Sequence, residues 1–332
     1  MVACVALADS THPHDALFKK TFSEVEHAAA QFRAVLPPQL VALTNFSTLA
    51  LCPGSYVDEE LVGSESDLLF SAQVGNQDAL FYILYEHQSS LDRLMPLRLL
   101  RYVVRILERH VQGKSAAEAL PLPLVIPVVL HHSETGWTFA RRLEELFDAD
   151  LLRQAGLLEL VPRLGFVLDD LSHLTDQQLE SRALGLMPAL TLWALRDSRN
   201  RDRLVRSIGH WANAMAELLR APNGREALRT IFRYITLVAD DSIASTLADA
   251  IPEAKPEVKE ALMTLAEKWM AEGEAKGEAK GEAKALRKLL TLKFGELPQT
   301  TLARIDAATP GELDRWLERV LTAATLEAVL EA

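Results

Sequence analysis

The sequence predicts an α/β fold, because helical and strand patterns alternate over its first 135 residues. Between Asp15 and Leu36, apolar residues recur at three- and four-residue spacing, which is the periodicity of one buried helix face. Runs rich in Val, Ile, Tyr and Phe follow, separated by Gly and Pro, as strands and turns require. The expected order of elements is helix, strand, strand, strand, helix, strand.

Composition and charge narrow the class of protein. Of the 332 residues, 49% are hydrophobic and 24% are charged, which is ordinary for a soluble globular protein. The net charge of −11 argues against non-specific coating of nucleic acid but leaves room for a local basic patch. The two cysteines give no disulfide framework, and we find no signal peptide or apolar run long enough to span a membrane. We therefore expect a cytoplasmic protein without membrane contact.

Three strands are expected after the first helix. One lies near 46–51, the next starts at Asp67, and the third ends in Glu86-His87-Gln88. Gly75-Asn76 between the second and third strands is typical of a turn, so these two strands are expected to be neighbours in the sheet.

The stretch from Leu91 to Gln112 predicts a helix with an apolar face and a separate line of arginines. The arginines recur three or four residues apart, at Arg98, Arg101, Arg105 and Arg109. Guanidinium groups match phosphate oxygens, which makes this line a candidate DNA-binding surface. A solvated helix face explains the same pattern equally well, because arginine is a good helix former.

The run from Leu122 to Leu130 is apolar throughout, which predicts a strand buried on both faces. Pro127 argues against full pairing on both sides at that position. His131-His132 follow the run; adjacent strand residues diverge, and no third ligand is spaced for zinc. They are interpreted as loop or strand-end histidines near the catalytic face.

The polar residues around the second and third strands are the candidate catalytic group. Asp67 opens one strand and Glu86 ends the next, so their carboxylates would meet at one edge of the sheet. Two hard oxygen ligands are what Mg²⁺ requires, and Gln88 shares a strand face with Glu86. Acidic residues also end strands simply because strand ends reach water, which is the alternative explanation. The Asp…Glu-x-Gln pattern and the element order resemble the PD-(D/E)XK nuclease core, with its αβββαβ order.

Several local blocks sharpen this resemblance. Over most of residues 1–135 the chain resembles the Rpn family, the recombination-promoting nucleases also called YhgA-like putative transposases. Five blocks carry the similarity in this order: HDALFK at 14–19, LP at 36–37, DLL at 67–69, YEHQS at 85–89 and MPLRLLRY at 95–102.

The resemblance implies a metal-dependent DNA endonuclease linked to DNA recombination or to defence against foreign DNA. Asp67 and Glu86 would be the ligands of Mg²⁺ (or Mn²⁺). Gln88 stands where the wider superfamily carries Lys; its neutral amide can orient a water or a phosphate oxygen but supplies no charge. Glutamine is the usual residue of the Rpn family at this position. The alternative is a non-catalytic DNA-binding or regulatory protein that keeps the nuclease fold.

The first helix offers a second set of candidates. Asp15, Lys19 and Glu24 lie on this helix, which in such folds can approach the site. Solvent exposure is the simpler explanation for all three residues.

Three regions are expected along the chain: a nuclease core at 1–135, a helical extension at 136–251, and a C-terminal part at 252–332. Within the extension, helices are predicted near 139–147, 150–155, 176–196, 201–219 and 224–239. One more edge strand is predicted near 164–168, followed by a turn at Asp169-Asp170. Aromatic residues at helical spacing in this region indicate core packing.

The C-terminal region contains Gly-Glu-Ala-Lys three times between Gly273 and Lys284. Glycines stacked at i,i+4 weaken a helix, each by ~1 kcal/mol relative to alanine. The glycine line either admits a close second helix or belongs to a solvated spacer. Short amphipathic helices follow, with a break at Gly295 and Pro298. The resemblance to the C-terminal part of Rpn proteins implies a tail that self-associates through residues 257–330 or regulates the protein.

Overall fold

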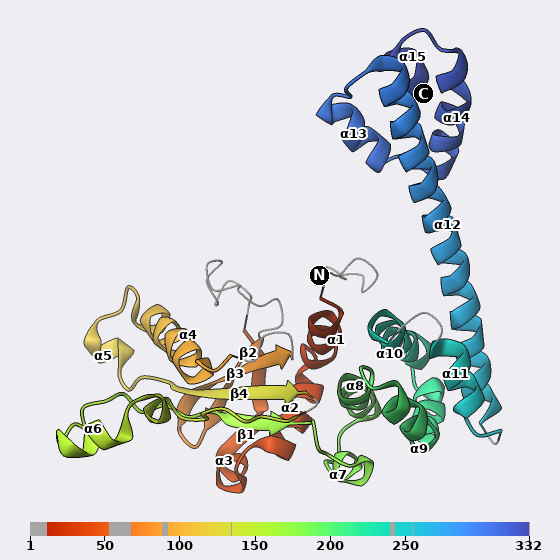
Figure 1. Cartoon of the computed structure of the whole chain (residues 1–332). Helices are drawn as coiled ribbons and strands as arrows, with labels where there is room; N and C mark the ends of the chain where they lie inside the picture. Colours follow the sequence, from red (N-terminus) through yellow and green to blue (C-terminus); the bar gives the residue numbers. More distant parts are fainter. Residues whose placement is uncertain are drawn as a thin grey trace. The chain divides into compact units, whose positions relative to one another are not determined.

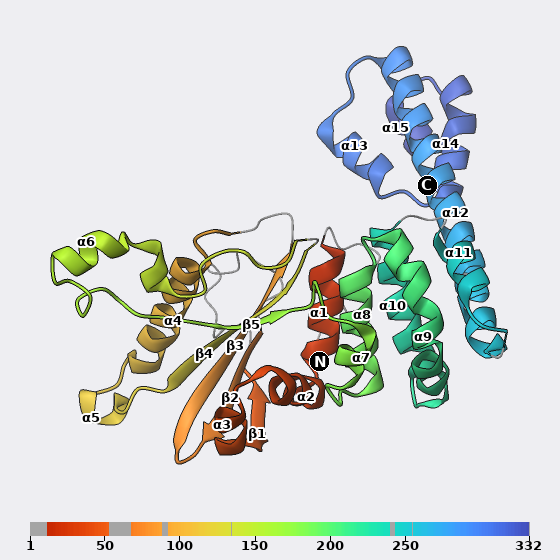
Figure 2. The ribbon, with the colours of Figure 1, turned by 60° about the horizontal axis from the view of Figure 1, so that its bottom comes forward.

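A computed structural model describes residues 12–52, 68–87, 92–133, 135–239, 243–253 and 255–331 (Figure 1). The chain forms two compact units, Met1–Ala261 and Leu262–Ala332. The first unit contains a β-sheet with helices on both faces and a bundle of helices beside it (Figures 1 and 2).

The sheet has five strands in the order β1-β2-β3-β4-β5. Their bounds are β1 Thr44–Leu51, β2 Leu68–Val74, β3 Gln77–His87, β4 Leu124–His132 and β5 Val167–Asp170. The first three strands pair antiparallel, whereas β3, β4 and β5 run parallel. Parallel neighbours place their carboxyl ends at one edge of the sheet. The mixed sheet with its helices confirms the α/β prediction.

Both faces of the sheet are covered by helices (Figure 2). The helices nearest the sheet are α1 Pro13–Phe22, α2 Val25–Val35, α3 Pro38–Leu43 and α4 Met95–Val111. Leu69 and Tyr82 pair across β2 and β3 and pack in the core cluster that includes α4. The next pair, Phe70 and Phe81, contacts Phe32 of α2 on the opposite face. The alternating apolar side chains of β2 and β3 thus supply two cores.

The helix predicted over residues 15–36 is two helices, α1 and α2. The chain turns at Ser23-Glu24, where Glu24 has an extended backbone conformation and precedes the first residue of α2. The prediction was wrong here because the apolar periodicity continues across the break. Helix α1 packs on the helical bundle, while α2 packs on β1 and β5.

β4 shows how the sheet accommodates a proline. β4 pairs with β3 from Leu124 to His132, but β5 pairs with β4 only from Val128 onward. At Pro127 the strand therefore has one neighbour, and the absent N–H is tolerated as it is at a sheet edge.

The remaining helices of the first unit lie mainly after β4. Their bounds are α5 Ala116–Ala119, η5 Leu143–Leu146, α6 Ala149–Gln154, α7 Asp176–Glu180, α8 Leu186–Asp197, α9 Arg201–Arg220, α10 Gly224–Val238 and α11 Ile243–Ala250. Trp193, Trp211, Phe232 and Tyr234 are buried in the bundle, as core packing predicts.

Two helix predictions in this region were wrong. The predicted helix at 139–147 contains only the short 3₁₀ turn η5. The predicted helix at 176–196 is split into α7 and α8, and Ala183 between them has a positive φ of 51°. A left-handed residue cannot continue a right-handed helix, so the chain changes direction there.

The second unit contains most of α12 Pro256–Phe294, followed by α13 Gln299–Asp306, α14 Pro310–Thr322 and α15 Leu326–Leu330. The Gly-Glu-Ala-Lys repeat lies within α12. Gly295 ends this helix with a φ of +85°, the left-handed conformation that favours glycine, as the predicted break required. Leu286, Leu313 and Trp316 are buried in one apolar core. No helix in the described part of the chain is long and apolar enough to cross a membrane.

Candidate functional site

The carboxyl edge of the parallel strands gathers polar residues from three neighbouring strands. Glu86 of β3 is in register with His131 of β4, and His131 with Asp170 of β5. One position earlier, Asp169 of β5 is in register with Leu130. Open α/β sheets bind ligands at the carboxyl ends of their strands, so this edge is the candidate site.

The predicted catalytic residues belong to two adjacent strands. Glu86 lies near the end of β3, where the structure describes its backbone; Asp67 and Gln88 lie outside the described residues. Leu68, the first residue of β2, pairs with Ile83 of β3. The beginning of β2 and the end of β3 therefore share the carboxyl edge.

Asp170 is held by neutral donors on the α4 side of the sheet. Its carboxylate accepts hydrogen bonds from the backbone N–H groups of Trp137 at 2.7 Å and Ser172 at 3.0 Å, and from the Ser172 hydroxyl. Burial alone would raise its pKa, but these hydrogen bonds and the nearby His131 bring the pKa of Asp170 below its ordinary value. Asp170 is thus kept ionised at neutral pH.

His131 lies on the same side of the sheet as Asp170. Its ring meets Trp137 edge to face, with 5.1 Å between ring centroids, and Nε2 is 3.0 Å from the Ser133 hydroxyl. Both histidine and tryptophan are therefore fixed beside the Asp170 carboxylate.

Gly136 allows the chain to pass close to this carboxylate. Its φ is +74°, and a Cβ at this position would lie 2.8 Å from Nε2 of His173 and 3.1 Å from Oδ2 of Asp170. Only glycine fits such an approach. The exposed His173 is consequently brought next to Asp170 at the mouth of the site.

Asp169 faces the α2 side and is bound by a cation. Arg182 donates two hydrogen bonds to its carboxylate, at 2.9 and 2.6 Å, and the Gln31 side chain of α2 donates another. The prediction of a turn at Asp169-Asp170 was wrong, since both residues are in β5. The apolar run ends at Leu168, yet pairing with β4 continues because each acidic side chain finds donors.

His132 contacts a second polar group, on the side of α1. Its ring lies 5.9 Å from that of His14, whose Nδ1 is 2.7 Å from the Tyr234 hydroxyl. Arg199 lies 3.2 Å from Nε2 of His14. Arginine can only donate, so Nε2 accepts and Nδ1 donates to Tyr234. Burial raises the pKa of Tyr234, and the phenol stays neutral.

The prediction placed His131 and His132 just after the strand; they occupy the last two positions of β4 and contact residues on opposite sides of the sheet. Among the described residues, no group of three or more His, Cys, Asp or Glu side chains has the arrangement of a metal site.

The arginine line of α4 runs away from the carboxyl edge. Arg98 is half-buried and pairs with Asp92 at 3.5 Å, whereas Arg101 is exposed. At the far end of the helix, His110 lines a cavity with Ala79, at the beginning of β3. Each residue adds ~1.5 Å along a helix, so Arg105 lies ~10 Å farther from the start of α4 than Arg98.

The second set of sequence candidates lies on α1 and at the break before α2, so the prediction that Glu24 belongs to the first helix was wrong. Lys19 is exposed on α1, Glu24 is exposed before α2, and Asp15 is half-buried. The α1 residue that the sequence argument missed is His14. Its signal was present, because His14, Leu17 and Phe18 are spaced three and four apart and share the buried helix face.

Comparisons with known proteins agree with this fold. The family model described as "Putative transposase, YhgA-like" matches residues 12–226. This match covers more than half of the chain, so the protein belongs to the YhgA-like putative transposase family. The predicted resemblance is confirmed.

The relatives of this chain include three proteins of Escherichia coli (strain K12). The inactive recombination-promoting nuclease-like protein RpnE is 32% identical over 237 residues, 70% of this chain and 73% of that protein. The recombination-promoting nuclease RpnC is 35% identical over 127 residues, 38% of this chain and 41% of that protein. The recombination-promoting nuclease RpnA is 28% identical over 236 residues, 70% of this chain and 74% of that protein. No solved structure matches this chain significantly.

Proposed function

We propose that this protein is a metal-dependent DNA endonuclease with a PD-(D/E)XK core. The observation that carries the proposal is the pairing of β2 with β3, in which Leu68 lies opposite Ile83. Asp67 directly precedes β2 and Glu86 lies near the end of β3, so the two carboxylates belong to adjoining strand ends. The names of the relatives RpnC and RpnA, both recombination-promoting nucleases, support the same activity.

The donor chemistry of these residues fits Mg²⁺ or Mn²⁺. Asp67 and Glu86 would hold the ion, because carboxylate oxygens on adjoining strand ends are hard ligands. Gln88 would orient a water molecule or a phosphate oxygen through its neutral amide. A bound divalent ion supplies an activated water and stabilises charge on the phosphate.

In this proposal the nuclease core comprises residues 1–135, and the extension at 136–251 completes its sheet. β5 comes from the extension and brings Asp169 and Asp170 to the carboxyl edge. The role would be in DNA recombination or in defence against foreign DNA.

A non-catalytic DNA-binding or regulatory protein is the second candidate function. It is favoured by one specific finding, the relative RpnE, whose name describes it as inactive although it aligns with 70% of this chain.

Plasmid cleavage by the full-length protein tests the two candidates. Nicking in Mg²⁺ should stop in EDTA and fall at least ~100-fold in Asp67→Ala and Glu86→Ala, because each removes a metal ligand. Asp78→Ala is the matched control: Asp78 is an exposed carboxylate at the opposite end of the same strand pair, and its loss should leave cleavage unchanged. If the folded protein binds DNA but cleaves it neither in Mg²⁺ nor in Mn²⁺, the second candidate is favoured.

We further propose that two copies associate through residues 257–330. Leu292 of α12 and Leu321 of α14 are 75% and 74% exposed, and Lys293, the neighbour of Leu292, donates a hydrogen bond to the Leu321 carbonyl. Exposed apolar groups on adjoining helices are typical of an interface. The double variant Leu292→Glu/Leu321→Glu should sediment as a monomer, and the exposed-site control Glu318→Gln as the wild-type assembly. Unchanged sedimentation of the double variant would contradict this interface.

A further inference from the structure

A polar cavity of about 440 Å³ lies next to the carboxyl edge of the sheet. Its walls are formed by the exit loop, residues 171–175 that follow β5, by Asp176 at the start of α7, and by α8 and α9. Ser172 belongs to both places, because it lines the cavity and its hydroxyl donates to Asp170 of the candidate site. The volume is within the range of ~300–1,000 Å³ that is typical of small-ligand pockets.

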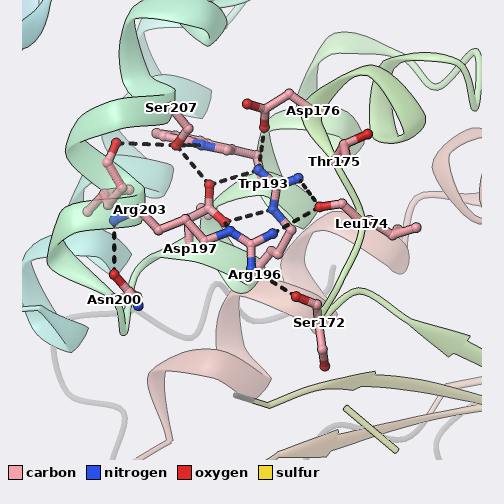
Figure 3. A network of polar contacts seen from close by, with 12 residues as sticks. Ser172, Leu174, Thr175, Asp176, Trp193, Arg196, Asp197, Asn200, Arg203 and Ser207 are labelled. Carbon is pink, nitrogen blue, oxygen red and sulfur yellow. Dashed lines mark hydrogen bonds and ion pairs between the residues drawn. The ribbon is translucent and has the colours of Figure 1, made fainter. Parts of the chain in front are cut away.

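The floor of the cavity is a buried ion-pair network (Figure 3). Asp197 is fully buried and accepts bonds from Arg196 at 2.7 and 2.8 Å, from Arg203 at 2.8 Å and from Ser207 at 2.8 Å. Asp176 pairs with Arg196 as well. Two carboxylates therefore balance the two guanidinium groups of Arg196 and Arg203.

The same two arginines hold the exit loop in place. Arg196 donates to the Leu174 carbonyl at 3.0 Å, while Arg203 donates to the carbonyls of Ser172 at 2.8 Å and Leu174 at 2.9 Å (Figure 3). The guanidinium of Arg203 is thus engaged by the exit-loop carbonyls and by the Asp197 carboxylate.

A third arginine adds a positive charge beyond those that Asp176 and Asp197 balance. Arg206 is exposed, lines the cavity, and lies one helical turn after Arg203 on α9. Burial lowers the pKa of Arg203, Asp197 opposes this effect, and the positive charges of Arg196 and Arg206 add to the lowering. Arg206 therefore adds a positive charge that faces solvent, and His173 of the exit loop lines the same cavity.

We propose that this cavity binds a phosphate group of the DNA strand, with Arg206 as the charged contact and His173 as a second donor. A guanidinium group matches phosphate oxygens, and the cavity adjoins the edge at which the scissile phosphate would lie. The inference rests on the proposed function, since it names DNA as the ligand. It is separate from the arginines of α4, which lie on another helix.

Equilibrium binding of a short labelled DNA duplex to the full-length protein in EDTA tests this proposal without cleavage. Arg206→Glu should weaken binding about three- to tenfold at ~0.1 M salt and make the dependence of log K on log salt shallower by about one unit. Arg206→Lys keeps the charge and should retain most of the affinity. Arg225→Glu reverses an exposed arginine of α10 outside the cavity lining and is the matched control, with binding like that of the wild type.

Three outcomes would overturn the inference, and they are distinguishable. Equal binding by Arg206→Glu and Arg225→Glu, with wild-type cleavage intact, would refute the cavity alone. A wild-type protein that neither binds nor cleaves DNA would refute the proposed function together with the cavity. The third outcome uses inorganic phosphate as the probe. If phosphate raises the melting temperature of the wild type but not of Arg206→Glu, and both bind DNA equally, the cavity binds a free anion and not DNA.

Discussion

Two carboxylates in the first unit, the buried Asp197 and the half-buried Asp170, are stabilised in opposite ways. Asp197 in the helical bundle is surrounded by two arginines and a hydroxyl. Asp170 at the carboxyl edge is held by backbone N–H groups and a hydroxyl, and within the part of the chain that the structure describes no arginine or lysine forms an ion pair with it. The bundle therefore neutralises its charge, whereas the sheet edge keeps a negative charge near solvent.

This difference indicates that Asp197 has a structural role and that Asp170 belongs to a candidate binding site. A carboxylate bound by guanidinium groups on several sides has no capacity left for a ligand, and it fixes the geometry of its surroundings. A carboxylate held by dipoles stays ionised and leaves room for a cation or a proton. We infer that the Arg196–Asp197–Arg203 network gives the exit loop its rigidity, while the polar groups of the sheet edge interact with what binds there.

The largest expected effect would come from breaking the scaffold. Asp197→Ala leaves the buried guanidinium of Arg196 without its main partner, so the free energy of unfolding should fall by ~3–5 kcal/mol. Urea denaturation measures this loss. Asp202→Ala removes an exposed carboxylate from the first turn of α9 and should change stability by less than ~0.5 kcal/mol. Similar losses in both variants would contradict a specific role for the network.

A smaller and pH-dependent effect is expected at the sheet edge. Asp170→Asn should cost ~1–2 kcal/mol at neutral pH, because it weakens the charge-assisted hydrogen bonds from Trp137 and Ser172. The folded pKa of Asp170 is lowered, so its contribution is fully present above the unfolded value near 3.8 and is lost as the pH falls through the folded value.

Urea unfolding between neutral pH and pH ~3 would show this dependence. The difference between wild type and Asp170→Asn should shrink at the acid end, whereas a difference that stays constant would mean that the ionised form is not what stabilises the fold. Asp202→Asn is the control, because its exposed carboxylate should give little difference at any pH.

The smallest effect is expected on DNA binding, and it compares arginines of α4 near the carboxyl edge of the sheet with arginines farther from it. Charge reversal at Arg98 and Arg101, at the beginning of α4, should weaken DNA binding about three- to tenfold and reduce its salt dependence. The same reversal at Arg105 and Arg109 should change affinity less than ~twofold, because ~10 Å of helix approaches the Debye length. Equal losses in both pairs would indicate binding along the whole helix, and no loss in either would leave the arginines as a solvated face.

The sequence predicted the four strands of the core and the helix before β4, because each of these elements carries a local pattern. The continuous apolar run of β4 and the turn at Gly75-Asn76 are examples that need no knowledge of partners. The same local reasoning was wrong where the chain changes direction without changing its apolar period. Ser23-Glu24 and Ala183 are such positions, because packing on different layers, not composition, divides the helices there.

The sequence by itself determined the α/β class, the family, and the neighbouring strands β2 and β3. The tertiary structure decided which polar groups meet. His14 reaches Tyr234 across 220 residues of chain, and Asp169 meets Gln31 across 138. Such contacts leave no periodic trace, because a buried polar side chain is satisfied by whichever donor the packing of distant elements brings to it.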